Sequence, residues 1–195
     1  MNPELTADAL ARLVRRYYPA GLLIDEPQYK ESEESQRLGM LLHANEGGSP
    51  VWKELIQRLR EKFPDCSLWD MTVPLLDPCY KCRVSQPGFV QGASRYDSVV
   101  CLVSQLAPVY ALYASHMEEK GPGLPRDHWL RFPPLPPEFQ AHETRLAALI
   151  ESTFGFTRLP NDVLFTPVPD LVPQTATFGL GKAQLIDCLF TPYRW

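Results

Sequence analysis

The sequence predicts a single α+β domain, in which a mainly antiparallel sheet with a central hairpin at about residues 98–116 is packed by three or four helices. The first observation is an apolar stretch whose two β-rich runs, 99–103 and 109–113, flank the turn-like pair Ala107-Pro108. The second is a set of segments with apolar residues at helical spacing. These segments cover about residues 5–18, 28–44, 50–62 and 138–153. The 195 residues are enough for one core, and nothing requires two domains.

Both faces of the predicted hairpin are apolar. Val99, Cys101 and Val103 alternate along the chain with Val100 and Leu102. A strand needs this pattern only where it is covered on both sides. We therefore expect packing elements above and below the sheet.

A membrane-spanning segment is the alternative interpretation of the same stretch. No charged residue lies between Asp97 and Glu118, and the length permits a span. Against it stand Ser104, Gln105 and Pro108, which are polar or helix-breaking residues that cost free energy in lipid. We expect a hairpin that is buried in protein, and no membrane partner.

The predicted helices have recognisable boundary residues. Ser49 is a suitable N-cap for the helix at 50–62, and Pro50 suits its first position. Pro19, Pro64 and Gly155 end the first, third and fourth helices.

Short apolar runs between prolines predict the remaining strands. We expect two of them before the hairpin and three after the last helix. They cover residues 67–73, 80–85, 163–165, 175–178 and 185–190.

Proline accounts for 20 of the 195 residues, about twice its usual share of ~5%. We interpret residues 121–137 as a proline-rich loop that Trp129, Leu130 and Phe132 hold against the body. A disordered linker would be poor in aromatic residues. A polyproline ligand for another domain is the alternative.

The acidic side chains gather in one run near the N-terminus. Five acids and one lysine, Lys30, give this run a net charge of 1 − 5 = −4, equal to that of the whole chain. The run indicates either a solvated helix face with acids near the positive end of the helix dipole, or a patch for a basic partner. The five acids are Asp25, Glu26, Glu31, Glu33 and Glu34.

Charge and cysteine content restrict the partners and the compartment. A net charge of −4 and a pI of about 5.6 provide no basic field that attracts nucleic acid. The N-terminus lacks the charged-then-apolar order of a secretory signal. With an odd number of cysteines, five, we expect a cytoplasmic protein with free thiols.

The motifs for metal and phosphate binding are incomplete. Cys79 and Cys82 form half of a zinc site, but no second close pair of ligands accompanies them. Gly181-Lys182 is followed by Ala183, where a phosphate-binding loop has a hydroxyl. We expect no metal and no cofactor.

The acid and base that are adjacent in the sequence are Asp127 and His128. Together with a cysteine they are the candidates for a small cytosolic hydrolase or transferase, although adjacent side chains commonly diverge. Isolated carboxylates such as Asp97 can pair only through the fold. His142 lies on the apolar stripe of the last long helix, and we interpret it as a packing residue.

The C-terminal segment 185–195 and the hairpin region 99–115 resemble small cytosolic immunity proteins of bacterial polymorphic toxin systems. The resemblance concerns an α+β body of under ~200 residues with Trp and Pro punctuation, and it carries over no functional residues. Cys79 and Cys82 depart from the paired Cys-x-x-Cys-Gly signature of one such group, because Arg83 replaces the glycine and the second pair is missing.

The resemblance implies a non-enzymatic inhibitor that binds a cognate toxin domain and occludes its active site. Acidic groups would steer a basic toxin, and aromatic side chains would anchor it. Trp195 has an alternative role in ordering the terminus, and an adaptor that acts through the proline-rich loop is a further option. The predicted contacts are Asp25, Glu26, Glu31, Glu33, Glu34, Trp129, Tyr193 and Trp195.

Overall fold

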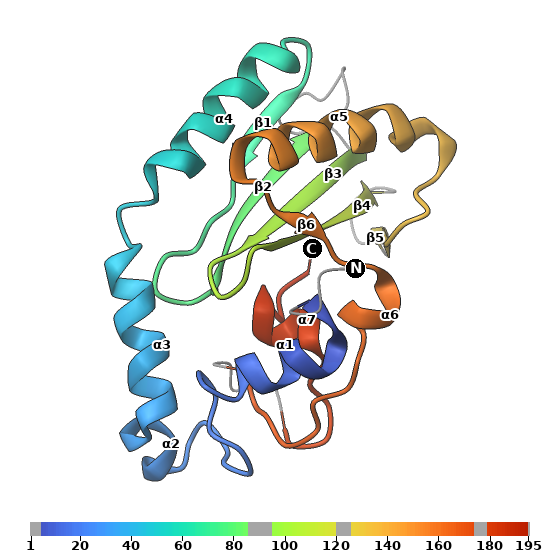
Figure 1. Cartoon of the computed structure of the whole chain (residues 1–195). Helices are drawn as coiled ribbons and strands as arrows, with labels where there is room; N and C mark the ends of the chain where they lie inside the picture. Colours follow the sequence, from blue (N-terminus) through green and yellow to red (C-terminus); the bar gives the residue numbers. More distant parts are fainter. Residues whose placement is uncertain (1–4, 86–94, 120–125, 174–178, 195) are drawn as a thin grey trace.

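The computed structural model describes residues 5–85, 95–119, 126–173 and 179–194, and it shows a sheet between two layers of helices (Figure 1). The sheet is antiparallel in the order β1-β2-β3-β4-β5, and a short strand β6 pairs in parallel with β4. The strands are β1 (Ser67–Asp70), β2 (Cys79–Ser85), β3 (Arg95–Ser104), β4 (Val109–Glu119), β5 (Arg126–Arg131) and β6 (Thr157–Arg158). The helices are α1 (Ala7–Val14), α2 (Pro27–Glu31), α3 (Glu33–Ala44), α4 (Pro50–Lys62), α5 (Pro137–Phe154), α6 (Asn161–Leu164) and α7 (Leu185–Leu189).

The predicted hairpin lies at the centre of the sheet. β3 and β4 pair antiparallel from Arg95 opposite Glu118 to Val103 opposite Tyr110. β2 flanks β3, and β5 flanks β4. The α+β class and the antiparallel sheet with a central hairpin are thus confirmed, and the strands run a few residues beyond 98–116.

Helices α4 and α5 cover one face of the hairpin (Figure 1). Leu55 of α4 and Phe139 of α5 belong to a buried cluster with Cys101 and Leu112. The helix at 50–62 forms as predicted because the Ser49 side chain accepts a hydrogen bond from the Trp52 amide at 3.0 Å.

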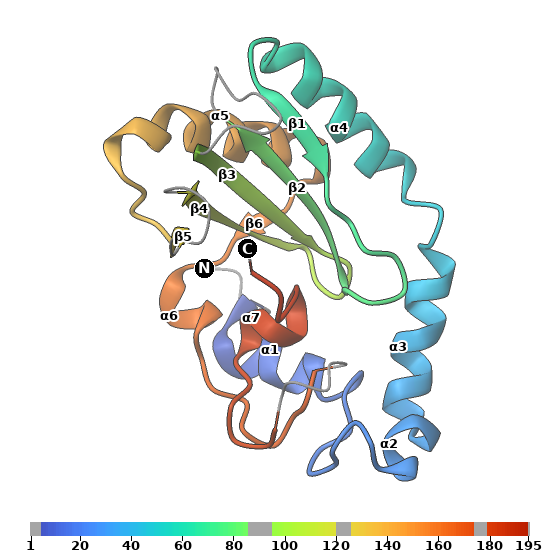
Figure 2. The same ribbon diagram turned by 180° about the vertical axis from the view of Figure 1, so that it is seen from behind.

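Segments from both ends of the chain cover the opposite face, where α1 and α7 lie together (Figure 2). Leu10 and Leu185 share a buried cluster with Leu102 and Tyr113 of the hairpin. The Tyr18 hydroxyl is buried and donates to the carbonyl of Cys188 at 3.0 Å. The two-sided cover that the alternating apolar pattern predicts is therefore present.

The segment predicted as one helix at 28–44 consists of two helices. Ser32 has an extended backbone, with φ −65° and ψ 148°, which ends α2. Its side chain accepts a hydrogen bond from the Ser35 amide at 3.1 Å and caps α3. A serine that is an efficient N-cap thus divides the apolar pattern.

The strands predicted at 163–165 and 185–190 are wrong, because these segments form the short helices α6 and α7. All five residues of α7 are buried. In a short segment that is buried on every side, apolar residues do not alternate with exposed polar ones. The sequence then shows no periodicity that distinguishes a helix from a strand. The strand predicted at 175–178 lies outside the described residues.

The prediction of a loop over residues 121–137 is wrong in part. Residues 126–131 form β5, which pairs with β4 so that Trp129 lies opposite His116. The aromatic residues do hold this segment to the body, since Phe132 packs against Tyr113 at a centroid distance of 5.3 Å. Strand pairing, which proline spacing does not reveal, fixes the rest.

Among the described residues, none of the helices has both the length and the apolar character that crossing a membrane requires. The apolar, charge-free stretch found in the sequence belongs to β3 and β4. The hairpin interpretation of that stretch is the one that the structure supports.

Truncation of one leucine on each face tests the two-sided burial. Leu102→Ala and Leu112→Ala should each lower the free energy of unfolding by about 2–5 kcal/mol, because each leaves a cavity in a different cluster. Urea denaturation measures the change. Leu180→Ala is the control, since that side chain is 43% exposed and should cost less than ~0.5 kcal/mol. A near-neutral result at either buried leucine would contradict the two-sided core.

Candidate functional site

A polar cluster lies at the end of the hairpin that is remote from its turn. His116 and Glu118 are two residues apart on β4, so their side chains project from the same face. The strand register places Asp97 of β3 and Trp129 of β5 on either side of His116, and Asp127 of β5 opposite Glu118. The cluster is thus built by strands rather than by loops.

The His116 ring is held from two directions. Its Nδ1 lies 2.6 Å from Oδ1 of Asp97, and its ring stacks on Trp129 with centroids 5.2 Å apart. The residue is 6% exposed. An ionised carboxylate can only accept, so Nδ1 carries a proton, and in the neutral ring Nε2 then keeps a lone pair for a ligand or a proton.

The Asp97 carboxylate accepts from two donors. In addition to His116, the Arg95 Nε donates to Oδ2 at 2.7 Å. Burial raises the pKa of Asp97, but the hydrogen bonds from His116 and Arg95 outweigh it and hold the pKa below its ordinary value. Asp97 is therefore an ionised carboxylate that orients the imidazole.

Three groups in the cluster bring ligand atoms together. A ring nitrogen of His116 and carboxylate oxygens of Glu118 and Asp127 all lie within 4.8 Å of one another. One imidazole and two carboxylates can bind a divalent cation or exchange a proton. Among the described residues, these three form a group of His, Asp and Glu side chains that could hold a metal ion.

Trp129 forms the wall of the cluster. It packs edge-on against Phe139 of α5 at 6.0 Å, and the Arg131 guanidinium lies over its ring at 5.1 Å. The side chain is half-buried. Trp129, which the sequence suggested as a partner contact, therefore lies against His116 in this structure.

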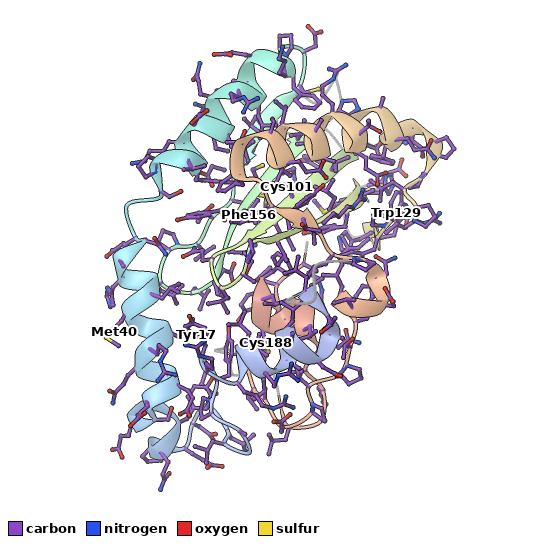
Figure 3. The ribbon with its side chains drawn as sticks, viewed as in Figure 1. Tyr17, Met40, Cys101, Trp129, Phe156 and Cys188 are labelled. Atoms are coloured by element: carbon purple, nitrogen blue, oxygen red, sulfur yellow. The ribbon has the colours of Figure 1, made fainter. Side chains whose placement is uncertain are left out.

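The acidic run lies elsewhere, on α2, on the first turn of α3 and just before them. Its five side chains are exposed or half-buried. Met40, which lies on α3, and Trp129 lie on opposite sides of the molecule (Figure 3). The structure does not bring the acidic run and Trp129 into one surface.

The C-terminal aromatic residues are only partly described. Tyr193 is half-buried, and its amide donates to the Thr191 side chain at 3.0 Å. Trp195 lies outside the described residues. The role of these two residues as partner contacts stays a prediction.

The acid–base pair predicted from adjacency does not form. Asp127 and His128 are consecutive on β5, so their side chains project from opposite faces. Asp127 instead shares the cluster with His116. Two features of the sequence could have indicated this cluster. Asp97 and His116 are about equally far from a turn near 106–108, so a hairpin places them opposite each other, and both strands end in polar residues.

The cysteines are free thiols, as expected. Cys79 and Cys82 are three residues apart on one strand and belong to different core clusters, so they do not share a site. Cys66 Sγ lies 3.4 Å from Nε2 of His142. Burial raises the pKa of the Cys66 thiol and lowers the pKa of His142. Both shifts favour the neutral forms, whereas a nucleophilic cysteine needs a thiolate, so we interpret the pair as a packing contact.

Comparisons of the chain with protein-family models, with curated proteins and with solved structures found no significant match.

Removal of the Asp97 charge tests the orienting role. Asp97→Asn should lower the free energy of unfolding at neutral pH by about 1–3 kcal/mol, because it weakens two charge-assisted hydrogen bonds. The folded-state pKa of Asp97 is depressed, so its contribution is present above the unfolded-state pKa and is lost as the pH falls through the folded-state pKa. The difference from wild type should therefore shrink on acidification.

Urea titrations over a pH series measure this dependence. Asp25→Asn is the control, because that side chain is exposed, and it should leave the stability nearly unchanged at every pH. A destabilisation by Asp97→Asn that is independent of pH would contradict the ionised pair.

Proposed function

We propose that this chain is a non-enzymatic binding protein of the immunity type, which neutralises a cognate toxin domain by covering its active site. The observation that carries the proposal is a set of carboxylates, at one side of the molecule, that form no ion pair with any residue that the structure describes. Within the described residues, the salt bridge in the acidic run is that of Glu33 with Arg37, at 4.0 Å. Four acids of the run form no salt bridge with another described residue, and these are Asp25, Glu26, Glu31 and Glu34.

Unneutralised charge on one side of a protein favours a partner of opposite charge. It accelerates association with a basic surface and discourages acidic partners. Many toxin domains that act on nucleic acid are basic, and an acidic inhibitor would compete with their phosphate substrate. This charge complementarity is the reason that we prefer a basic toxin domain as the partner.

The acidic segment is fixed to the body. The buried Tyr29 hydroxyl donates to the carbonyl of Val172 at 2.7 Å, and the Arg37 guanidinium donates to the carbonyl of Arg16 at 2.5 Å. A surface that is already ordered loses little conformational entropy when a partner binds. α2 and α3 can therefore present their carboxylates in a fixed arrangement.

Apolar side chains adjoin the acidic helix. Met40 of α3 is 66% exposed and points away from the body (Figure 3). At the far end of α3, the Asn45 side-chain amide donates to the side-chain oxygen of Gln105 at 3.0 Å. The backbone N–H of Gln105 in turn donates to the carbonyl of Pro78, in the β1–β2 loop, at 2.9 Å. That loop exposes Val73, Leu75 and Leu76. Exposed apolar groups beside charged ones are typical of protein-binding surfaces.

A second candidate function is a small hydrolase or transferase. The observation that favours it is the His116 ring oriented by Asp97, because an oriented imidazole can act as a general base. Such an enzyme should lose its activity on His116→Ala, whereas the proposed inhibition by the acidic side should not change. Broad substrate screens of the wild type and this variant separate the two functions.

Charge reversal in the acidic run tests the proposed function. The product of the gene next to that of this chain is co-purified, and its binding is measured by surface plasmon resonance at low and physiological ionic strength. The double variant Glu31→Lys/Glu34→Lys should slow association by about tenfold or more, with a smaller change in dissociation, because the lost charges act in steering.

The matched control reverses two exposed charges on α4, Glu54→Lys/Glu61→Lys. It changes the net charge of the chain equally and should affect association much less. Equal effects of the two double variants would contradict a local acidic surface. Absence of binding by the neighbouring gene product at both ionic strengths would contradict the immunity role.

A further inference from the structure

We infer that His116, Glu118 and Asp127 form a binding site for one divalent transition-metal ion, in which Asp97 orients the histidine. The site lies on the α5 side of the sheet, at the end of β3, β4 and β5. It is distinct from the acidic run, and it does not depend on the proposed inhibition of a toxin.

The three ligand atoms are close enough to converge on a common ion after small side-chain movements. They lie within 4.8 Å of one another. Ligands at ~2.1 Å from one ion are ~3.4 Å apart in a tetrahedral site and at most ~4.2 Å apart when they lie opposite each other. Glu118 is half-buried and Asp127 is exposed, so small rotations of these side chains close the difference while the buried histidine stays in place.

His116 provides the strongest evidence that the site binds a ligand. The residue is 6% exposed, and Asp97 occupies Nδ1. Within the described part of the chain, no hydrogen bond reaches its other ring nitrogen. A buried imidazole with a carboxylate on one nitrogen and a free lone pair on the other is the usual arrangement of a metal-binding histidine.

The charges of the site also favour a cation. Glu118 and Asp127 face each other directly across β4 and β5, and like charges in that position destabilise a sheet. Asp97 adds a third carboxylate. Arg95 pairs with Asp97 and lies opposite Glu118 in the register, so it offsets part of this charge, but its side chain is 63% exposed. A divalent ion bound by Glu118 and Asp127 would reduce the repulsion between them further.

The donor set selects the class of metal. One imidazole nitrogen and two carboxylates suit Zn²⁺ or Mn²⁺, whereas Ca²⁺ prefers a larger set of oxygen ligands. Among these ions Zn²⁺ generally forms the more stable complexes with such ligands. Because Asp127 lies at the surface, water would complete the coordination sphere.

The test is the binding of Zn²⁺ alone to the reduced full-length chain, measured by competition with a chromophoric chelator. The wild type should bind one ion, and Glu118→Gln/Asp127→Asn should bind it at least tenfold more weakly. That double variant keeps the buried histidine and its packing, so it should fold even if His116→Ala does not. His128→Ala is the matched control, because His128 lies on the opposite face of β5, and it should leave the affinity unchanged.

Co²⁺ provides a second measurement that identifies the ligands. Bound Co²⁺ should show d–d absorption without a thiolate charge-transfer band, because the proposed ligands are nitrogen and oxygen. A thiolate band would assign the binding to the cysteines and overturn the inference. Absence of stoichiometric Zn²⁺ binding, or equal affinity in the wild type and Glu118→Gln/Asp127→Asn, would overturn it as well.

Discussion

Residues 99–103 of β3 and 109–114 of β4 are each at most 1% exposed, so water reaches neither face of the hairpin. Covering both faces requires two separate layers of helices. The middle of the chain supplies α4 and α5, and the two ends supply α1 and α7 (Figure 1). The ends must therefore meet, and the two hydrogen bonds from Arg15 to Asp170, at 2.7 and 2.8 Å, join them. The buried hairpin thus dictates the arrangement of the whole chain.

The same strands continue past the apolar part of the core. Past the pair of Ser98 and Ser115, the register places Asp97 opposite His116, and the side chains change from apolar to polar. Strands that are fixed by a packed core hold such groups more accurately than loops do. The polar cluster is a consequence of this rigidity, since its residues come from three paired strands and need no loop to position them.

Local patterns were sufficient for the hairpin and for the helices at 50–62 and 138–153, because periodicity and capping residues specify them. They were insufficient for α7, which is buried all round, and for β5, whose pairing with β4 is a long-range event. The cluster was missed for the same reason. Asp97 and His116 face each other only in the correct register, and Asp127 joins them only when β5 is recognised as a strand.

The acidic side on α2 and α3 and the cluster at His116 occupy opposite sides of this frame, so each can be altered without the other. Both depend on the buried hairpin, which we expect to open only when the whole protein unfolds. Native-state hydrogen exchange of the β3 and β4 amides tests this most directly. Amides within 99–103 and 110–114 should exchange only through global unfolding, with a free energy equal to that from urea denaturation. Exchange through a smaller, local opening would contradict the account.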